Sequence, residues 1–245
     1  AKSSAISYDN LGVQVTPIAS ASTEPPSLTA TPGEVDPATI MNQLHSLTGI
    51  DGDVELQTAD APPSTPWGAG PNSVVSVSAN SQSPFENLFA PGSLGIHMPN
   101  RGEYDGFGQP LPNAKPDKDG RLFVAFDFRC ASQDAGGNGS WRYYIGHGPG
   151  NSAAVELFFN GTEFFRRSGD AREPVTPLNI GQWYQVQLTL DLNSKTYAGV
   201  LASDDRRVDF TSQFATGWDG TIDHTFIDSY GHIGGVRPAL DADNF

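Results

Sequence analysis

The chain has 245 residues, enough for one large β-domain or two small ones. Lys plus Arg number 14 and Asp plus Glu 28, and the formal net charge of −14 argues against nucleic acid and anionic membrane surfaces because both would repel it. The same balance suits divalent cations and neutral or basic partners. A single cysteine, Cys130, excludes an intrachain disulfide and is expected to be a core thiol.

No apolar run approaches the roughly 20 residues that a membrane-spanning helix needs, so we expect no membrane insertion. The chain begins at Ala1 without a methionine, which fits a mature or excised product. A domain of this size without cysteine pairs is more typical of bacterial secreted proteins than of eukaryotic extracellular ones. We therefore expect a secreted or cell-surface location, in a bacterium.

Three regions follow one another along the chain. Residues 1–15 predict an N-terminal strand over "AISYDNLGVQV". Residues 16–50 are rich in Pro, Ser and Thr, which indicates a linker, and they end in a short predicted helix that Asp36 could cap. From residue 51 to residue 245, Gly and Pro separate many short β-rich runs, which predicts an all-β antiparallel sandwich.

Alternation of apolar and polar residues is clearest after residue 120. In "RLFVAFDFRC", residues 121–130, every second side chain is apolar, as in a half-buried strand. The dipeptide Asn160-Gly161 separates two apolar runs and predicts a hairpin, because both positions tolerate a positive φ. Residues 181–201, "GQWYQVQLTLDLNSKTYAGVL", predict a second hairpin. Its first strand should bury four side chains, those of Tyr184, Val186, Leu188 and Leu190.

Three of these segments carry a family resemblance. They are the hairpin at 181–201, "DGRLFVAFDFR" at 119–129 and "HIGGVRPALDADNF" at 232–245. They resemble a hairpin, the strand before it and the closing segment of the concanavalin A-like lectin/glucanase superfamily, and of its laminin-G-like modules in particular. The resemblance covers roughly residues 75–245 and implies an antiparallel jelly-roll β-sandwich, here with an extended N-terminal segment. Because the superfamily holds lectins, adhesion modules, glycosidases and polysaccharide lyases, it does not choose a function.

The two ends of the chain share an Asp-Asn-apolar triplet, at 9–11 and at 243–245. We expect the N-terminal strand to pair with the C-terminal one. The family resemblance implies a structural Ca²⁺ near the chain ends, and Asp9, Asp241 and Asp243 are its predicted ligands, since calcium prefers oxygen donors. The alternative is that the asparagines bond local backbone in turns and the aspartates are solvated.

The segment "SWRYYIGHG" contains the candidate ligand site. Strand alternation puts Trp141, Tyr143 and His147 on one face, where aromatic rings could stack on a sugar beside polar groups. In the alternative interpretation, Trp141 and Tyr143 are core aromatics. The expected partner is a glycan or a cell-surface polymer, with copies of the chain itself as another candidate.

The residue patterns that would indicate a catalytic site are weaker than those that indicate a binding site. A glycosidase needs two carboxyl groups facing one bond, and only Glu156 and Glu163 could meet across a predicted hairpin. A lyase needs a cation beside a proton-moving Tyr or His, but alternation puts Arg142 and Tyr144 on the face opposite His147. The sequence therefore favours a non-catalytic extracellular carbohydrate-binding or adhesion module. A polysaccharide-degrading enzyme of the same fold, either a lyase or a glycoside hydrolase, and a structural subunit of a surface layer or filament remain alternatives.

Overall fold

The computed structural model of the protein describes most of the chain after residue 53. The described residues are 54, 57–70, 72–85, 94–99, 102–112, 114–132 and 138–245. Within them the chain forms fourteen strands and no helix. The prediction of an all-β antiparallel jelly-roll sandwich is confirmed. The predicted N-terminal strand, the linker and the helix at Asp36 lie outside the described residues.

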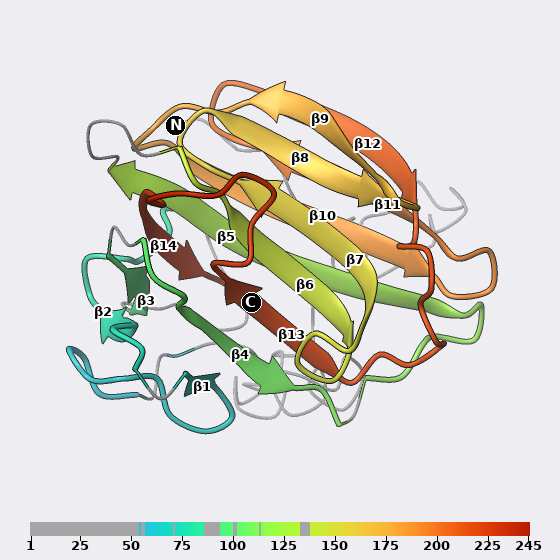
Figure 1. Ribbon diagram of the computed structural model, residues 1–245, viewed down its shortest axis with the longest axis horizontal. Coiled ribbons are helices and arrows are strands. Elements are labelled where there is room, and N and C mark those ends of the chain that lie inside the picture. Colours follow the sequence, from blue (N-terminus) through green and yellow to red (C-terminus); the bar gives the residue numbers. More distant parts are fainter. Residues whose placement is uncertain are drawn as a thin grey trace, which may run out of the picture.

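Two seven-stranded sheets make up the sandwich, and every pair of neighbouring strands is antiparallel. Figure 1 shows them stacked face to face. Sheet A has the strand order β1 (Gly68–Ala69), β4 (Gly106–Pro110), β13 (His224–Asp228), β6 (Trp141–His147), β7 (Ser152–Phe159), β8 (Glu163–Ser168) and β9 (Ala171–Pro177). Sheet B has the order β12 (Arg207–Gln213), β11 (Thr196–Ala202), β10 (Trp183–Asp191), β5 (Arg121–Ser132), β14 (Ala239–Asp243), β3 (Gly95–Met98) and β2 (Ser76–Ser78).

The core fills the space between the sheets and is rich in aromatic rings. Phe126 of β5 stacks on Tyr143 of β6 with ring centroids 4.3 Å apart, and Phe128 stacks on Phe159 of β7 at the same distance. Cys130, in line with both phenylalanines, is buried as expected. The alternation of β5 therefore places every second residue from Leu122 to Cys130 against sheet A and leaves Phe123, Asp127 and Arg129 on the outer face of sheet B.

The predicted hairpin at 181–201 lies in the middle of sheet B. Its first strand, β10, pairs with β5 on one side and with β11 on the other. The prediction that four of its side chains are buried is confirmed, since none exceeds 2% exposure: Tyr184, Val186, Leu188 and Leu190. The Asn160-Gly161 hairpin is also present, joining β7 to β8, and the Asn160 side chain accepts hydrogen bonds from the backbone N–H groups of Thr162 and Glu163.

The last strand, β14, sits between β5 and β3 and pairs with both. Both of its hydrogen-bonding edges are thus occupied over residues 240–242. Phe245 follows it into the core, where its ring lies 4.7 Å from that of Trp67. Residues 1–15 lie outside the described residues, so the pairing of the N-terminal strand with the last strand stays a prediction.

Candidate functional site

The outer face of sheet A carries a buried network of charged side chains centred on Arg142. Strand β6 turns Arg142 away from the core, toward carboxylates on the two flanking strands. Its guanidinium donates to both carboxylate oxygens of Asp228 on β13, at 3.0 and 2.7 Å, and to Glu156 Oε1 on β7 at 2.7 Å. The network thus joins three adjacent strands, β13, β6 and β7.

Glu156 is shared between two arginines. Its second oxygen accepts a hydrogen bond from Arg167 on β8 at 2.5 Å. Glu156 and Asp228 are only 4% and 3% exposed, so each depends on its guanidinium partners to offset the loss of water. The two carboxylates and two arginines therefore form a rigid, charged floor.

Tyrosine side chains surround this floor. Tyr230, which is 63% exposed, lies over the Arg142 guanidinium with its ring centroid 4.7 Å away. Tyr104, 67% exposed, places its hydroxyl 3.5 Å from Asp228, and partial burial of the phenol together with that carboxylate raises its pKa. Tyr144 is buried instead and stacks on the ring of Phe226 at 4.2 Å. Two tyrosines thus offer ring surface to solvent beside the charged floor.

A hollow of about 320 Å³ opens beside this network. Its walls include Arg172 of β9, residues 150–153, which lead into β7, and the loop segment 215–217. This loop belongs to the connection that carries the chain from β12 in sheet B to β13 in sheet A. It is fixed to sheet A by a backbone hydrogen bond from Ala215 to Ala154, at 3.0 Å. We call this hollow, with Arg142, Glu156, Arg167, Arg172 and Tyr230 in its lining, the Arg142 hollow.

Two of the three residues predicted to bind a ligand lie in the core. Trp141 is fully buried and donates its indole N–H to the carbonyl of Pro238, and Tyr143 is 2% exposed. Neither ring face is free to stack on a sugar, so the platform expected on this face of β6 is not formed. Alternation alone correctly placed Trp141 and Tyr143 on the same face of β6. It could not tell which face of the strand packs against the other sheet. The side chains pointing outward are those of Arg142 and Tyr144.

His147 is the third predicted residue and lies at the end of β6. Its side chain is 40% exposed, and its Nδ1 lies 2.6 Å from a carboxylate oxygen of Asp219. This hydrogen bond raises the pKa of the imidazole. His147 therefore belongs to a loop contact at the end of the sheet and is not part of an aromatic platform.

The aspartates predicted to hold calcium contact protein groups. Asp241 is 2% exposed, and its carboxylate accepts from Arg129 at 2.6 Å and lies 2.8 Å from His97 Nδ1. Asp243 accepts the backbone N–H of Ser83 at 2.6 Å. Among the described residues, no cluster of three or more His, Cys, Asp or Glu side chains could hold a metal ion. Asp9 lies outside those residues, and calcium binding stays a prediction.

The structure separates the two glutamates considered for a glycosidase, but it brings together two of the residues considered for a lyase. Glu163 is exposed, whereas Glu156 is buried against Arg142 and Arg167, so the two glutamates do not face each other. Arg142 and Tyr144 do line one hollow, together with Tyr230. The Tyr144 hydroxyl, however, donates to the carbonyl of His147 and accepts from the N–H of Ser152.

Sequence reasoning missed Asp228, Tyr230, Arg167 and Arg172. Asp228 and Tyr230 stand in "TFIDSYG" and have no local signal, because their role depends on β13 lying beside β6, some 80 positions earlier in the chain. The sequence signal that could have found them is Arg142 itself, which stands between the two core aromatics of β6. A buried charged side chain in that position needs a carboxylate on a neighbouring strand.

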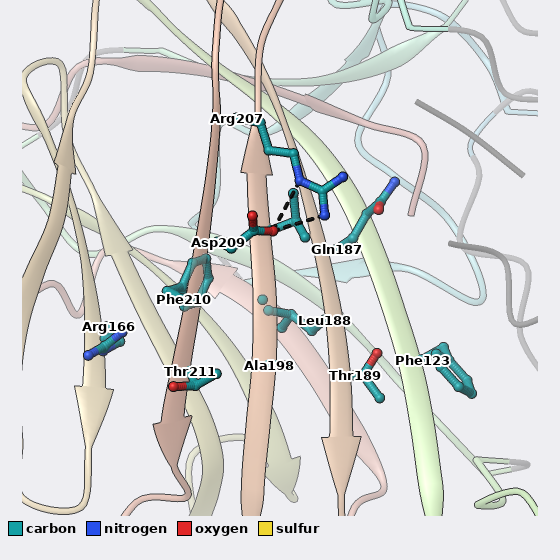
Figure 2. A pocket seen from close by; sticks show the side chains of 12 residues that line it. Phe123, Arg166, Gln187, Leu188, Thr189, Ala198, Arg207, Asp209, Phe210 and Thr211 are labelled. Atoms are coloured by element: carbon teal, nitrogen blue, oxygen red, sulfur yellow. Dashed lines mark hydrogen bonds and ion pairs between the residues drawn. The ribbon is translucent and has the colours of Figure 1, made fainter. Parts of the chain in front are cut away.

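A second hollow, of about 560 Å³, lies over the outer face of sheet B. Figure 2 shows Phe123, Thr189 and Gln187 on neighbouring strands, and Arg207 joined to Asp209. Phe123 is 47% exposed. The charged residues in its lining are Arg166 of β8 and the pair Arg207 and Asp209 of β12. The side chains of Arg207 and Asp209 are both exposed, in contrast to the buried network on sheet A.

Comparisons with known proteins show the fold. No protein-family model matches the chain, and no curated protein matches its sequence. Among solved structures, the catalytic domain of a glycoside hydrolase family 131 protein from Coprinopsis cinerea matches with a TM-score of 0.54 and 13% identity, over 79% of this chain and 90% of that one. A family 131 β-glucanase catalytic domain from Podospora anserina matches with a TM-score of 0.51 and 14% identity, over 79% and 92%.

The chain has the concanavalin A-like jelly-roll fold. A sialidase also matches, with a TM-score of 0.51 and 16% identity over 80% of this chain, but the chain spans only 18% of that protein's length. At these identities the likeness concerns the fold alone, and sites on such folds differ widely. The described part of this jelly roll contains no helix long and apolar enough to cross a membrane.

Proposed function

We propose that the protein binds carbohydrate, and that it does so at the Arg142 hollow. The observation that carries the proposal is the pairing of exposed tyrosine rings with a fixed charged floor. Tyr230 and Tyr104 are the exposed rings beside Asp228 and Arg142. Pyranose rings stack on aromatic faces, and a few charged or polar groups then orient their hydroxyls.

The same geometry disfavours glycoside hydrolysis. A glycosidase uses one carboxyl group as a proton donor and a second as a base or nucleophile. Glu156 and Asp228 are the paired carboxylates here, and both accept hydrogen bonds from the same guanidinium, that of Arg142. Both groups are therefore engaged in holding an arginine, and neither is free for proton transfer. The family 131 structures share the fold, which supports a carbohydrate ligand but does not transfer their activity.

Polysaccharide lysis is the second candidate, and one observation favours it. Arg142 and Tyr230 share one hollow, so a cation and a phenol could face one substrate. A lyase would use the cation against the uronate carboxylate and the phenol to move a proton. Binding is preferred because Arg142 is already engaged by two carboxylates.

A glycan array with two single variants tests the proposal and places the site. We expect Tyr230→Ala to weaken binding at least tenfold, about 1.4 kcal/mol, because it removes the exposed ring over Arg142. The matched control is Phe123→Ala, which removes the exposed ring of the hollow on sheet B and should leave binding unchanged. Loss of binding with Phe123→Ala alone would move the site to sheet B, and no glycan binding at all would refute the proposal.

The glycans that bind on the array are then used to test for catalytic turnover and for a calcium requirement. Each bound polysaccharide is incubated with the protein and assayed for new reducing ends and for the ultraviolet absorbance of an unsaturated uronate. We expect neither signal, and turnover that Tyr230→Phe abolishes would establish the lyase alternative. A parallel array with EDTA measures whether binding depends on the proposed calcium ion.

A further inference from the structure

We propose that the glycan bound in the Arg142 hollow carries carboxylate groups, as uronates and sialates do, and that Arg172 binds them. This inference rests on the proposed function and names the class of its ligand. Its evidence is the arrangement of charge in the hollow, which differs from that of the whole chain.

The hollow is rich in arginine although the chain is strongly negative. Three guanidinium groups line it, those of Arg142, Arg167 and Arg172, beside one carboxylate, that of Glu156. Two further carboxylates pair with the lining from outside it, Asp228 with Arg142 and Asp170 with Arg167, so neither of them is spent on Arg172 in a chain whose formal net charge is −14. At physiological ionic strength the Debye length is about 8 Å, so a ligand inside the hollow responds mainly to these near groups.

Arg172 supplies the positive charge that the network does not use. It is exposed, and within the described part of the chain no carboxylate forms an ion pair with it. Its guanidinium lies over the ring of Phe158, 5.1 Å from the centroid. This contact holds the group in place through its flat face, and its N–H donors lie in the guanidinium plane. A planar fork of donors is the group that suits a carboxylate best, because it can bind both oxygens at once.

The position of Arg172 in the sheet gives a second reason. Arg172 of β9 is the register partner of Arg167 of β8, so two arginines stand directly opposite each other on adjacent strands. Like charges in this arrangement are destabilising unless an anion lies between or beside them. Arg167 already has two carboxylate partners, Glu156 at 2.5 Å and Asp170 at 3.8 Å. A ligand carboxylate at Arg172 would complete the neutralisation, beside the ring of Tyr230.

The test compares acids with their masked forms. Binding is measured by calorimetry for an oligogalacturonate and its methyl ester, and for sialyllactose and lactose, with wild-type protein, Arg172→Gln and Arg207→Gln. The last variant removes one exposed arginine from sheet B and is the matched control for net charge. We expect the wild type and Arg207→Gln to bind at least one acid tenfold or more tightly than its masked form. Arg172→Gln should bind both forms alike.

The salt dependence gives an independent readout. Affinity for the acid should fall as salt rises in the wild type and should change less in Arg172→Gln. Equal affinity for acid and masked forms in the wild type would overturn the carboxylate inference and leave carbohydrate binding intact. A preference that survives Arg172→Gln would overturn the role of Arg172. Absence of binding to every glycan on the array would instead refute the proposed function.

Discussion

Asp127 is a carboxylate on the outer face of a sheet that is nevertheless buried. It stands between two apolar residues of β5, Phe126 and Phe128, which point into the core. It does face outward from sheet B, yet it is 1% exposed and accepts hydrogen bonds from Ser83 Oγ at 2.7 Å and from the side chain of Asn244. Its other oxygen, Oδ1, is buried without a hydrogen-bond partner in the described structure. Burial raises the pKa of Asp127 to about 7, even though the bonds from Asn244 and Ser83 oppose the shift.

This shift predicts that Asp127→Asn stabilises the protein at alkaline pH. The folded pKa lies above the ordinary value of 3.8, so the folded state holds a proton that the unfolded state releases. The stability contributed by this proton is fully present below the unfolded pKa and is lost as the pH rises through 7, by about 1.4 kcal/mol per pH unit. Asparagine mimics the protonated carboxyl group and does not titrate.

Urea unfolding at several pH values measures the effect. The variant should be more stable than the wild type by a few kcal/mol at about pH 8, and the difference should shrink toward about pH 4. Asp209→Asn, which changes an exposed aspartate of the same sheet, is the control for the loss of one carboxylate. A variant that is less stable than the wild type across the whole range would show that Asp127 is ionised in the folded protein.

Single strands were predicted better than the contacts between them. Strand β10 was readable because its alternation is complete over residues 184–190, and its hairpin turn follows directly. The outward side chains of β6 were also grouped correctly. The choice of face was missed because both groups contain large aromatics, and only the neighbouring strands β7 and β13 decide which group is covered.

A pair of adjacent substitutions in β10 tests the register of this strand. Leu188 is 2% exposed between the sheets, so Leu188→Ala should lower the free energy of unfolding by about 2–5 kcal/mol, the usual cost of a truncated core leucine. Thr189 points to the outer face and is only half-buried, so Thr189→Ala should cost less than about 1 kcal/mol. Chemical denaturation of the two variants measures both values. Equal losses would contradict the inward and outward assignment.

At the scale of the whole molecule, the sequence predicted the sandwich but not how it is closed. The strands and the family resemblance were enough for two antiparallel sheets, because alternation and turn residues are local properties. The position of β14 could not be predicted from local sequence, because it pairs with β3 and β5, whose residues lie more than 100 positions earlier in the chain. The Asp-Asn-apolar triplet shared by the two ends carries no information about β3 or β5, and the pairing with residues 1–15 that it suggested stays a prediction.

Removal of β14 should therefore abolish cooperative folding of the sandwich. Deleting residues 239–245 leaves facing edges of β3 and β5 unpaired, takes the fully buried Leu240 and Ala242 out of the core, and removes the partner of Arg129, Asp241. A sheet split in its interior exposes backbone groups on both sides of the gap, which no surface substitution does. The control is a deletion of residues 244–245 alone, which keeps every strand pair but loses the Phe245 ring from its contacts with Trp67 and Phe107. Thermal unfolding followed by tryptophan fluorescence should show a single transition at a lowered Tm for the control and none for the larger deletion. A cooperative transition near the wild-type Tm in the larger deletion would mean that β5 and β3 hold the sandwich together without the last strand.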